Sequence, residues 1–435
     1  MRAYDIILKK RNGEKLREEE LRFMVEGFLK GEVADYQMSA FLMAVFFRHL
    51  DEEEAFSLTK VMMESGDKID LSDVNGFKID KHSSGGVGDK TTLVFAPLVS
   101  ACGLKIAKMS GRSLGHTGGT IDKLESIPGF RTTLELNEFK DVVKEYGLAI
   151  VGQTANLAPA DKKIYALRDA TATVDEISLI ASSIMSKKLA VGSDGLILDV
   201  KVGSGAFIKD LNDAEKLAKF MVEIGKKHGK KVRAIITDMN QPLGRMVGNS
   251  LEVLEAIETL KDSGPEDFTK LCVELSAHAL EMAGMYSLED AKKILHEKLR
   301  NGEALERFRK MVSAQGGDPR VVDEPTRILP ISNEKLEVKA GKSGYISKMD
   351  TEKIGLAVML LGAGRKRKDD TIDHGVGLEV LRKTGDRVEK GDSLVRMYVS
   401  EKSDIDGAKK LILEAYEISE DSNVEMPPLI YKVIR

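Results

Sequence analysis

The chain has 435 residues, of which 42% are hydrophobic and 31% are charged. Its 66 lysines and arginines are balanced by 70 aspartates and glutamates, and the resulting net charge of −4 argues against nonspecific binding to nucleic acid, which needs excess positive charge. No apolar run approaches the roughly 20 residues of a membrane-spanning helix, and a chain of this length can bury a large core without disulfides or metal.

The amino terminus and the two cysteines indicate where in the cell the protein is located. Residues 1–10 contain an acidic residue and an apolar run of only three residues, which does not fit a signal peptide. Cys102 and Cys272 each lie in an apolar helical pattern, and this favours buried free thiols in a reducing compartment over a disulfide. We therefore expect a cytoplasmic protein.

The first 65 residues predict a set of helices, because apolar residues recur there at spacings of three and four. Ser-Gly-Asp at 65–67 is expected to end the third helix. From there to about residue 240, short apolar strands alternate with helices. The strands are expected at 77–80, 104–107, 148–151, 196–200 and 232–236. This alternation is typical of βαβ units and predicts a mostly parallel sheet.

The rest of the chain changes character twice. Residues 250–313 return to a helical pattern, and prolines mark a linker at 318–330. Beyond it, short strands with glycine turns predict a small α+β domain. The sequence thus predicts an α/β protein with an N-terminal helical domain (1–70), an α/β domain (71–330) and a C-terminal α+β domain (331–435).

The first glycine-rich segment, residues 81–92 (KHSSGGVGDKTT), leaves a predicted strand and enters an apolar helix. Glycines at such a junction let backbone N–H groups approach an anion, and lysine, serine and threonine side chains add donors. The segment lacks the glycine–lysine spacing of a P-loop. An ordinary capped turn would explain one or two glycines, whereas three glycines beside these donors favour a phosphate site.

A second segment, residues 108–125 (KMSGRSLGHTGGTIDKLE), also follows a strand. Alone it could be a structural turn, but loops that follow neighbouring parallel strands meet at one edge of a sheet, so we expect the two segments to form one site. A third segment, residues 198–207, resembles the opening of a dinucleotide fingerprint. Ile208 stands where the third glycine belongs, and we expect close backbone packing there instead of a cofactor site.

The second segment closely resembles the signature of the thymidine and pyrimidine-nucleoside phosphorylases, and residues 81–83 match the same family at the same distance. The resemblance covers essentially the whole chain. It implies reversible phosphorolysis, in which a pyrimidine nucleoside and inorganic phosphate give a free base and a (deoxy)ribose 1-phosphate. It also implies a homodimer without an organic cofactor, in which residues 156–192 join the N-terminal helices and serve dimerisation and base binding.

The resemblance assigns phosphate binding to side chains that the glycine-rich segments had already suggested: Lys81, Ser83, Thr92, Lys108, Ser110 and Thr120. It assigns the base to Arg168, Ser183 and Lys187. Ser183 and Lys187 are four residues apart in a helical pattern and so share a face.

Two of the base-binding residues would also be catalytic. Arg168 and Lys187 would donate to the pyrimidine as it leaves with negative charge. His82 would donate a hydrogen bond or a proton to a base oxygen, and His116 would orient its loop. Because the base and phosphate residues lie in different parts of the chain, we expect a cleft that closes during the reaction.

Members of bacterial type hold a monovalent cation, and the resemblance places a potassium site here at Gly88, Lys90, Leu243, Met246 and Glu255. Lys90 departs from the expected threonine, so its ammonium group could replace the ion. Ser113 likewise replaces an expected glycine. Members that accept both uridine and thymidine resemble this sequence in having a lysine at position 108, whereas strict thymidine enzymes tend to carry an apolar residue there, so the resemblance favours broad specificity for uridine, thymidine and deoxyuridine.

Two alternatives stay open at this point. An enzyme like anthranilate phosphoribosyltransferase would share the helical domain, the α/β domain and a glycine-rich phosphate loop, but it would need a magnesium-binding acidic pair. The long C-terminal domain argues against it. That domain is itself similar to a biotinyl or lipoyl carrier. A carrier would present a modifiable lysine on an exposed hairpin turn, whereas residues 362–370 read GAGRKRKDD, so we expect a structural domain.

Overall fold

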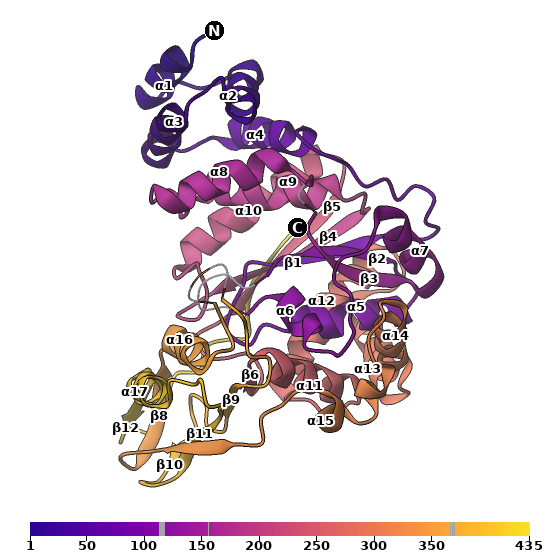
Figure 1. Cartoon of the computed structure of the whole chain (residues 1–435), viewed down its shortest axis with the longest axis vertical. Coiled ribbons are helices and arrows are strands. Elements are labelled where there is room, and N and C mark those ends of the chain that lie inside the picture. The colour runs from indigo at the N-terminus through magenta and orange to yellow at the C-terminus, as the bar shows by residue number, and fades with distance from the viewer. Residues whose placement is uncertain (113–117, 155, 366, 368–369) are drawn as a thin grey trace.

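The computed structural model describes residues 1–112, 118–154, 156–365, 367 and 370–435. Ser113 and His116 of the second glycine-rich segment lie outside the described residues, as does part of the basic run at 365–368. Every helix within the described ranges is too short or too polar to span a bilayer. Figure 1 shows the helical part at one end of the molecule and the C-terminal domain at the other, with the sheet between them.

Four helices open the chain: α1 (Ala3–Arg11), α2 (Glu18–Lys30), α3 (Asp35–Arg48) and α4 (Glu52–Glu64). The helix end expected at 65–67 therefore belongs to the fourth helix and not the third. The apolar faces of these helices share one core with α8 (Pro159–Ala170) and α9 (Ile177–Ala190), which lie beside them in Figure 1. Ser182 on α9 donates to the backbone carbonyl of Ala55 on α4 at 3.2 Å. Two segments distant in sequence thus build the helical part.

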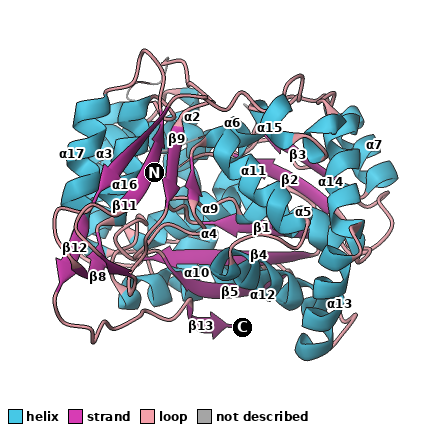
Figure 2. Cartoon of the chain, turned by 90° about the horizontal axis from the view of Figure 1, so that it is seen from below, coloured by secondary structure: helices cyan, strands magenta, loops and turns pink. Residues whose placement is uncertain are grey.

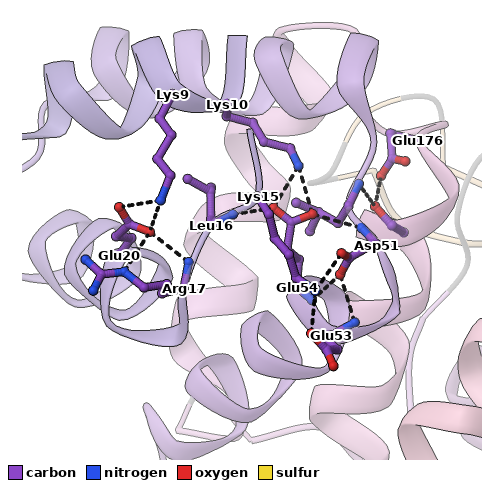
Figure 3. Close-up of polar contacts among 12 residues, drawn as sticks. Lys9, Lys10, Lys15, Leu16, Arg17, Glu20, Asp51, Glu53, Glu54 and Glu176 are labelled. Atoms are coloured by element: carbon purple, nitrogen blue, oxygen red, sulfur yellow. Dashed lines mark hydrogen bonds and ion pairs between the residues drawn. The ribbon is translucent and has the colours of Figure 1, made fainter. Parts of the chain in front are cut away.

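A buried ion pair joins α1 to α4. Lys10 Nζ lies 2.8 and 2.9 Å from the two carboxylate oxygens of Glu54, and both side chains are less than 5% exposed. Glu54 also accepts hydrogen bonds from the backbone N–H groups of Leu16 and Asp51, each at 2.9 Å (Figure 3). The carboxylate is therefore fully paired although it is buried.

The central sheet has the strand order β1-β4-β5-β13. Strands β1 (Ile79–Ser83), β4 (Gly195–Val202) and β5 (Lys231–Asp238) are parallel. A second parallel pair, β2 (Ile106–Ser110) and β3 (Leu148–Gly152), continues beside β1 through a bridge between Lys78 and Lys105. The expectation of a mostly parallel sheet is confirmed. β13 (Ile430–Ile434) differs from it, because it pairs antiparallel with β5 at the edge (Figure 2).

Helices cover both faces of this sheet, since all eight residues of β4 are buried. Leu196, Leu198 and Val200 pack into the core that contains α9 and α10 (Leu211–Lys227). Ile197 and Ile235 point the other way. They pack with α5 (Thr91–Ala101), α11 (Asn249–Leu260) and α12 (Glu266–Met282). The helical part therefore packs directly against one face of the sheet, next to the strand ends that carry the glycine-rich segments.

Shorter elements complete the α/β part. They are α6 (Thr120–Glu125), α7 (Leu136–Tyr146), β6 (Met246–Val247), α13 (Leu288–Arg300), α14 (Glu303–Ala314), a 3-10 turn (Pro319–Val322) and α15 (Pro325–Ile328). The predicted helical return after residue 250 is thus confirmed by α11 to α14. The proline-rich stretch forms short helical turns because Pro319 and Pro325 each occupy a first helical position.

In its described residues the C-terminal domain contains two small sheets and two helices, as expected of an α+β unit. One sheet has the order β6-β9-β11-β7, with β7 (Lys335–Lys339), β9 (Gly377–Val380) and β11 (Ser393–Tyr398). The other has the order β10-β8-β12, with β8 (Gly344–Met349), β10 (Arg387–Val388) and β12 (Tyr416–Ser419). Helices α16 (Thr351–Leu361) and α17 (Ile405–Ala415) pack together. Because β6 comes from the α/β part, its pairing with β9 anchors this domain.

Candidate active site

The first glycine-rich segment lies between the end of β1 and the start of α5. Residues 81–83 end β1, and Thr92 lies in the first turn of α5. Gly88 has a φ of +75°, and a Cβ atom there would lie 2.8 Å from the carbonyl oxygen of Leu243, so a side chain would not fit. The loop is therefore pressed against the segment that follows β5.

Charged side chains lie buried beneath this loop. Lys81, which is 1% exposed, donates to the Thr91 hydroxyl and lies 3.3 Å from the Asp199 carboxylate. Lys201 pairs with the same carboxylate at 2.9 Å. Burial disfavours the charged form of Asp89, but the ammonium groups of Lys81 and Lys201 outweigh burial and hold the pKa of this carboxyl well below its usual range. The buried charges beneath the loop are therefore paired with one another.

Two lysines bring the second glycine-rich segment to the first. Lys108 on β2 donates to the backbone carbonyl of Lys81 on β1. Lys123 on α6 donates to the backbone carbonyl of Asp89 at 2.6 Å and pairs with Glu252 at 2.7 Å. The described parts of the two segments therefore meet at one edge of the sheet, as the ends of neighbouring parallel strands should.

The hydroxyl groups expected at the phosphate lie at the same edge. Ser83 and Ser110 are the last residues of β1 and β2, and Thr120 is the first residue of α6. Ser83 Oγ donates to the Asp89 side chain, which also accepts from the backbone N–H of Thr91 at 3.1 Å. Asp89 therefore fixes the position of one of the expected phosphate donors.

Buried lysines gather at this edge. Asp80 lies 2.9 Å from Lys188 and 3.7 Å from Lys108, so one carboxylate faces two ammonium groups. Burial, and then the charge of Lys188, lowers the pKa of Lys108 to about 7. The described residues of this cluster include four buried lysines, Lys81, Lys108, Lys188 and Lys201, and the aspartates Asp80, Asp89 and Asp199 that lie beside them. Several ammonium groups close together suit a multiply charged anion.

His82 on β1 is close enough to Lys81, Lys108 and Lys187 for the charges of all three to act on its ring. Burial, and then the charges of Lys188 and Lys108, lowers its pKa well below the usual value, and Lys187 contributes in the same direction. Nε2 is shielded from solvent, and none of the described residues forms a hydrogen bond with it. The imidazole is therefore neutral near pH 7 and can donate one N–H, but it does not carry a proton to give away as an acid.

The base residues lie on α8 and α9. Lys187 Nζ lies 2.9 Å from Ser183 Oγ, so these two side chains share one face of α9 as the four-residue spacing requires. Lys187 also forms an ion pair with Asp161 on α8. The Lys187 side chain is 21% exposed and is thus accessible to a ligand while it is held from behind.

Arg168 has a different environment from the one expected of a base-binding group. Its side chain is buried and donates to the backbone carbonyls of Thr173 (3.1 Å), Val174 (2.6 Å) and Leu179 (3.1 Å). It therefore fixes the connection between α8 and α9. These bonds use three of the five guanidinium N–H groups, which leaves two for a ligand.

Comparisons with known proteins identify the family. A family model described as the glycosyl transferase family a/b domain matches residues 75–305, and that family's helical bundle domain matches residues 4–66. The pyrimidine nucleoside phosphorylase C-terminal domain matches residues 345–419. The chain is 54% identical to the pyrimidine-nucleoside phosphorylase of Geobacillus stearothermophilus and 51% identical to that of Staphylococcus aureus, each over 100% of both chains. The chain belongs to the pyrimidine-nucleoside phosphorylase family.

The structural comparison accounts for the alternative considered above. The crystal structure of anthranilate phosphoribosyltransferase from Thermus thermophilus matches with a TM-score of 0.59 and 19% identity, and covers 72% of this chain and 99% of that one. At this identity the likeness shows a shared fold alone. Full-length similarity to phosphorylases and a matching phosphorylase C-terminal domain place the chain with them instead of with the phosphoribosyltransferases.

Several polar residues of the site were not anticipated from the sequence: Asp80, Asp161, Lys188, Asp199 and Lys201. Two signals in the sequence could have indicated them. Asp199 and Lys201 interrupt a strand that is otherwise apolar, and charges in a buried strand need partners. Asp161 precedes Arg168 by two helical turns, which places both on one face of α8.

The residues expected at a potassium ion also come together. Leu243, Met246 and Glu255 surround the Lys90 ammonium group, and Gly88 packs against the backbone of Leu243. In the third glycine-rich segment, a Cβ atom on Gly203 would lie 2.8 Å from the backbone nitrogen of Asn240, in line with the expected close backbone packing.

Proposed function

We propose that this protein catalyses the reversible phosphorolysis of pyrimidine nucleosides, including uridine, thymidine and deoxyuridine. An oxygen of inorganic phosphate bonds to C1′ of the sugar while the bond from C1′ to the base nitrogen breaks. The electron pair of that bond goes to the base, which takes up a proton, and the sugar leaves as (deoxy)ribose 1-phosphate. The reaction needs no organic cofactor.

The observation that carries this proposal is the cluster of four buried lysines, Lys81 on β1, Lys108 on β2, Lys201 on β4 and Lys188 on α9. A phosphate dianion bound there would be both the nucleophile and a negative charge beside the sugar as C1′ becomes cationic. Lys81 and Lys108 would bind it, with the hydroxyls of Ser83, Ser110, Thr92 and Thr120. Burial strengthens these contacts, because the surrounding apolar core screens charge less than water does.

Negative charge that develops on the leaving base would be stabilised from the opposite side. Lys187, held by Asp161, would donate to a base oxygen, and Ser183 would orient the ring. The neutral His82 would donate its N–H to the other base oxygen, and the two remaining N–H groups of Arg168 would complete the set. Fixed donors of this kind stabilise a transition state because they need no rearrangement as charge appears.

Closure of the helical part on the α/β part would complete the site. Arg168, Ser183 and Lys187 belong to α8 and α9, whereas His82 and the phosphate residues belong to β1, β2 and the segments that follow them. Reaction requires the attacking oxygen and C1′ to come within about 3–3.5 Å of each other. We infer that the substrates draw the two parts together, since each part supplies only one half of the contacts.

We also propose that two copies form a homodimer through α1 and α3. Tyr4, Tyr36 and Phe47 on these helices are 64%, 76% and 70% exposed. Large aromatic side chains exposed together are typical of an interface, and a second copy would cover them. Tyr36→Glu with Phe47→Glu should then halve the mass measured by light scattering. Free thiols at Cys102 and Cys272 support the expected cytoplasmic location.

The test of the activity is ultraviolet detection of free base after incubation with uridine or thymidine, with and without inorganic phosphate. Release of base only in the presence of phosphate would support phosphorolysis, and similar rates for the two nucleosides would support broad specificity. Release without phosphate would make the protein a hydrolase and remove the reason for the lysine cluster. Failure to release base from either nucleoside would contradict the proposal.

A further inference from the structure

Lys90 carries a buried positive charge that the proposed reaction does not use. The side chain is fully enclosed between the first glycine-rich segment and the backbone that follows β5. Its Nζ atom donates to the carbonyl oxygens of Leu243 at 2.7 Å and Met246 at 2.9 Å, and it forms an ion pair with Glu255. The Phe268 ring centroid lies 5.0 Å away. Three oxygens and one ring face therefore surround the ammonium group.

The surroundings of Lys90 are fixed as tightly as the group itself. Glu255 also accepts hydrogen bonds from the backbone N–H groups of Arg245 (2.9 Å) and Met246 (3.2 Å). A Cβ atom on Gly244 would lie 2.9 Å from Lys90 Nζ and even closer to the Glu255 carboxylate, so only glycine fits there. The carboxylate and the turn at 244–246 thus form a preformed set of oxygens around one positive charge.

These residues do not fit a bound potassium ion. The oxygens expected to hold such an ion already bind Lys90 Nζ, and an added cation would lie against an ammonium group in a site of low dielectric constant. A second lysine, Lys383, pairs with Asp267, whose carboxylate accepts from the N–H of Gly244 at 3.2 Å. Positive charge is therefore supplied to this region by the chain itself.

We propose that Lys90 is a tethered cation that takes the place of a monovalent metal ion and positions the phosphate loop. The loop side of this connection is Asp89, the preceding residue, which holds Ser83 and Thr91 through its side chain. The other side is the segment 243–247, from which β6 pairs with β9 and Arg245 donates to the carbonyl of Leu381 at 3.0 Å. Lys90 thus joins the phosphate loop to the base of the C-terminal domain.

The first experiment needs no variant. The unfolding temperature of the full-length protein is measured in potassium, sodium and tetramethylammonium chloride at equal ionic strength, and the rate of base release is measured in the same buffers. Both should be the same in all three salts. A specific rise in unfolding temperature or rate with potassium would overturn the proposal. The unfolding temperature is independent of the proposed reaction, so this arm holds even if the activity proves to be another.

Two matched variants then distinguish the effect of the Lys90 charge from the effect of the volume that its side chain fills. Lys90→Thr removes the ammonium group and leaves room for an ion, whereas Lys90→Met removes the charge but fills the room. In tetramethylammonium chloride both should unfold several degrees below the original protein, because Glu255 is left buried without its partner. Potassium should restore the unfolding temperature of Lys90→Thr and leave that of Lys90→Met unchanged.

The kinetic readout distinguishes positioning of the loop from general stability. At a temperature where Lys90→Thr stays folded, its KM for phosphate should rise on the order of 10-fold without potassium and return when potassium is added, while the KM for the nucleoside stays constant. The proposal would be contradicted if potassium restored the unfolding temperature or the KM for phosphate of Lys90→Met. It would also be contradicted if both quantities were the same in every salt for Lys90→Thr. If neither variant folds, the salt comparison on the unaltered protein still decides it.

Discussion

Lys108 donates to the backbone carbonyl of Lys81, and this contact joins β2 to β1 directly below the proposed phosphate site. The Lys108 ammonium group lies where burial and the neighbouring charge of Lys188 lower its pKa. The two residues belong to the two glycine-rich segments, so the contact also couples the geometry of one segment to that of the other.

Anion binding should therefore depend on pH near neutrality. Below its pKa of about 7 Lys108 is charged, and above it the group becomes neutral, so affinity for an anion should fall as pH rises. Sulfate is the suitable probe, because its charge does not change in this range while that of phosphate does. Its inhibition constant against phosphate should rise between pH 6 and 8.

Lys108→Met should remove this pH dependence and weaken sulfate binding at pH 6, where the original side chain is charged. Lys105→Met provides the control, since Lys105 lies just before the same strand and its ammonium group donates to the backbone carbonyl of Lys144 in an exposed contact. A sulfate inhibition constant that stays flat across this range in the original protein would show that Lys108 does not titrate there.

His82 should act as a hydrogen-bond donor and not as an acid. His82→Asn keeps an N–H donor and should retain more activity than His82→Phe, which we expect to lose on the order of 10²-fold in kcat. Equal losses in the two variants would mean that the N–H group is not what matters. Both comparisons are made at saturating phosphate and nucleoside.

The lowered pKa of His82 also has a consequence for stability. The folded protein keeps the ring neutral, whereas the unfolded chain takes up a proton below its ordinary pKa of about 6.5. Stability should thus fall as pH drops below that value, by the linkage between protonation and unfolding. In His82→Phe, unfolding by urea should depend less on pH between 5 and 7 than in the original protein.

Asp161 should position Lys187 for the base. Lys187→Met removes the proposed donor and should lower kcat on the order of 10²- to 10³-fold, as expected for one donor to a developing anion. Asp161→Asn keeps Lys187 but removes its partner, and should give a smaller loss. Lys209→Met is the control, because that lysine pairs with Glu352 at the surface and not with a residue of the proposed site. A larger loss for Asp161→Asn than for Lys187→Met would contradict this order.

The ion pair between Lys10 and Glu54 should be necessary for the stability of the helical part. Glu54→Gln leaves a buried ammonium group without its charge partner, and we expect a loss of about 3–5 kcal/mol in the free energy of unfolding. Glu53→Gln is the matched control one residue earlier, since Glu53 pairs with Lys15 at the surface (Figure 3) and should change the unfolding temperature little. Similar unfolding curves for the two variants would refute the distinction.

Much of the fold could be predicted because it depends on local patterns. Alternating apolar strands and helices indicated the parallel sheet, and the glycine clusters marked the ends of β1 and β2. Pairings between distant residues left no such local trace. Asp80 on β1 meets Lys188 on α9 across 108 residues, and β13 reaches β5 from the far end of the chain. The role of Arg168 could not be predicted from the sequence either. A guanidinium group can bind a ligand or backbone carbonyls, and the fold of the turn after α8 determines which of them lie within its reach.

The return of β13 to the central sheet means that the C-terminal domain is an insertion and not an appendage. The chain leaves the α/β part before β7 and comes back to it at β13, so the domain is connected to its neighbour at both ends. Double attachment limits how far the domain can swing away, and it makes the last residues of the chain part of the sheet edge. Removing residues 430–435 would therefore uncover β5 and give a neighbouring chain a strand to pair with.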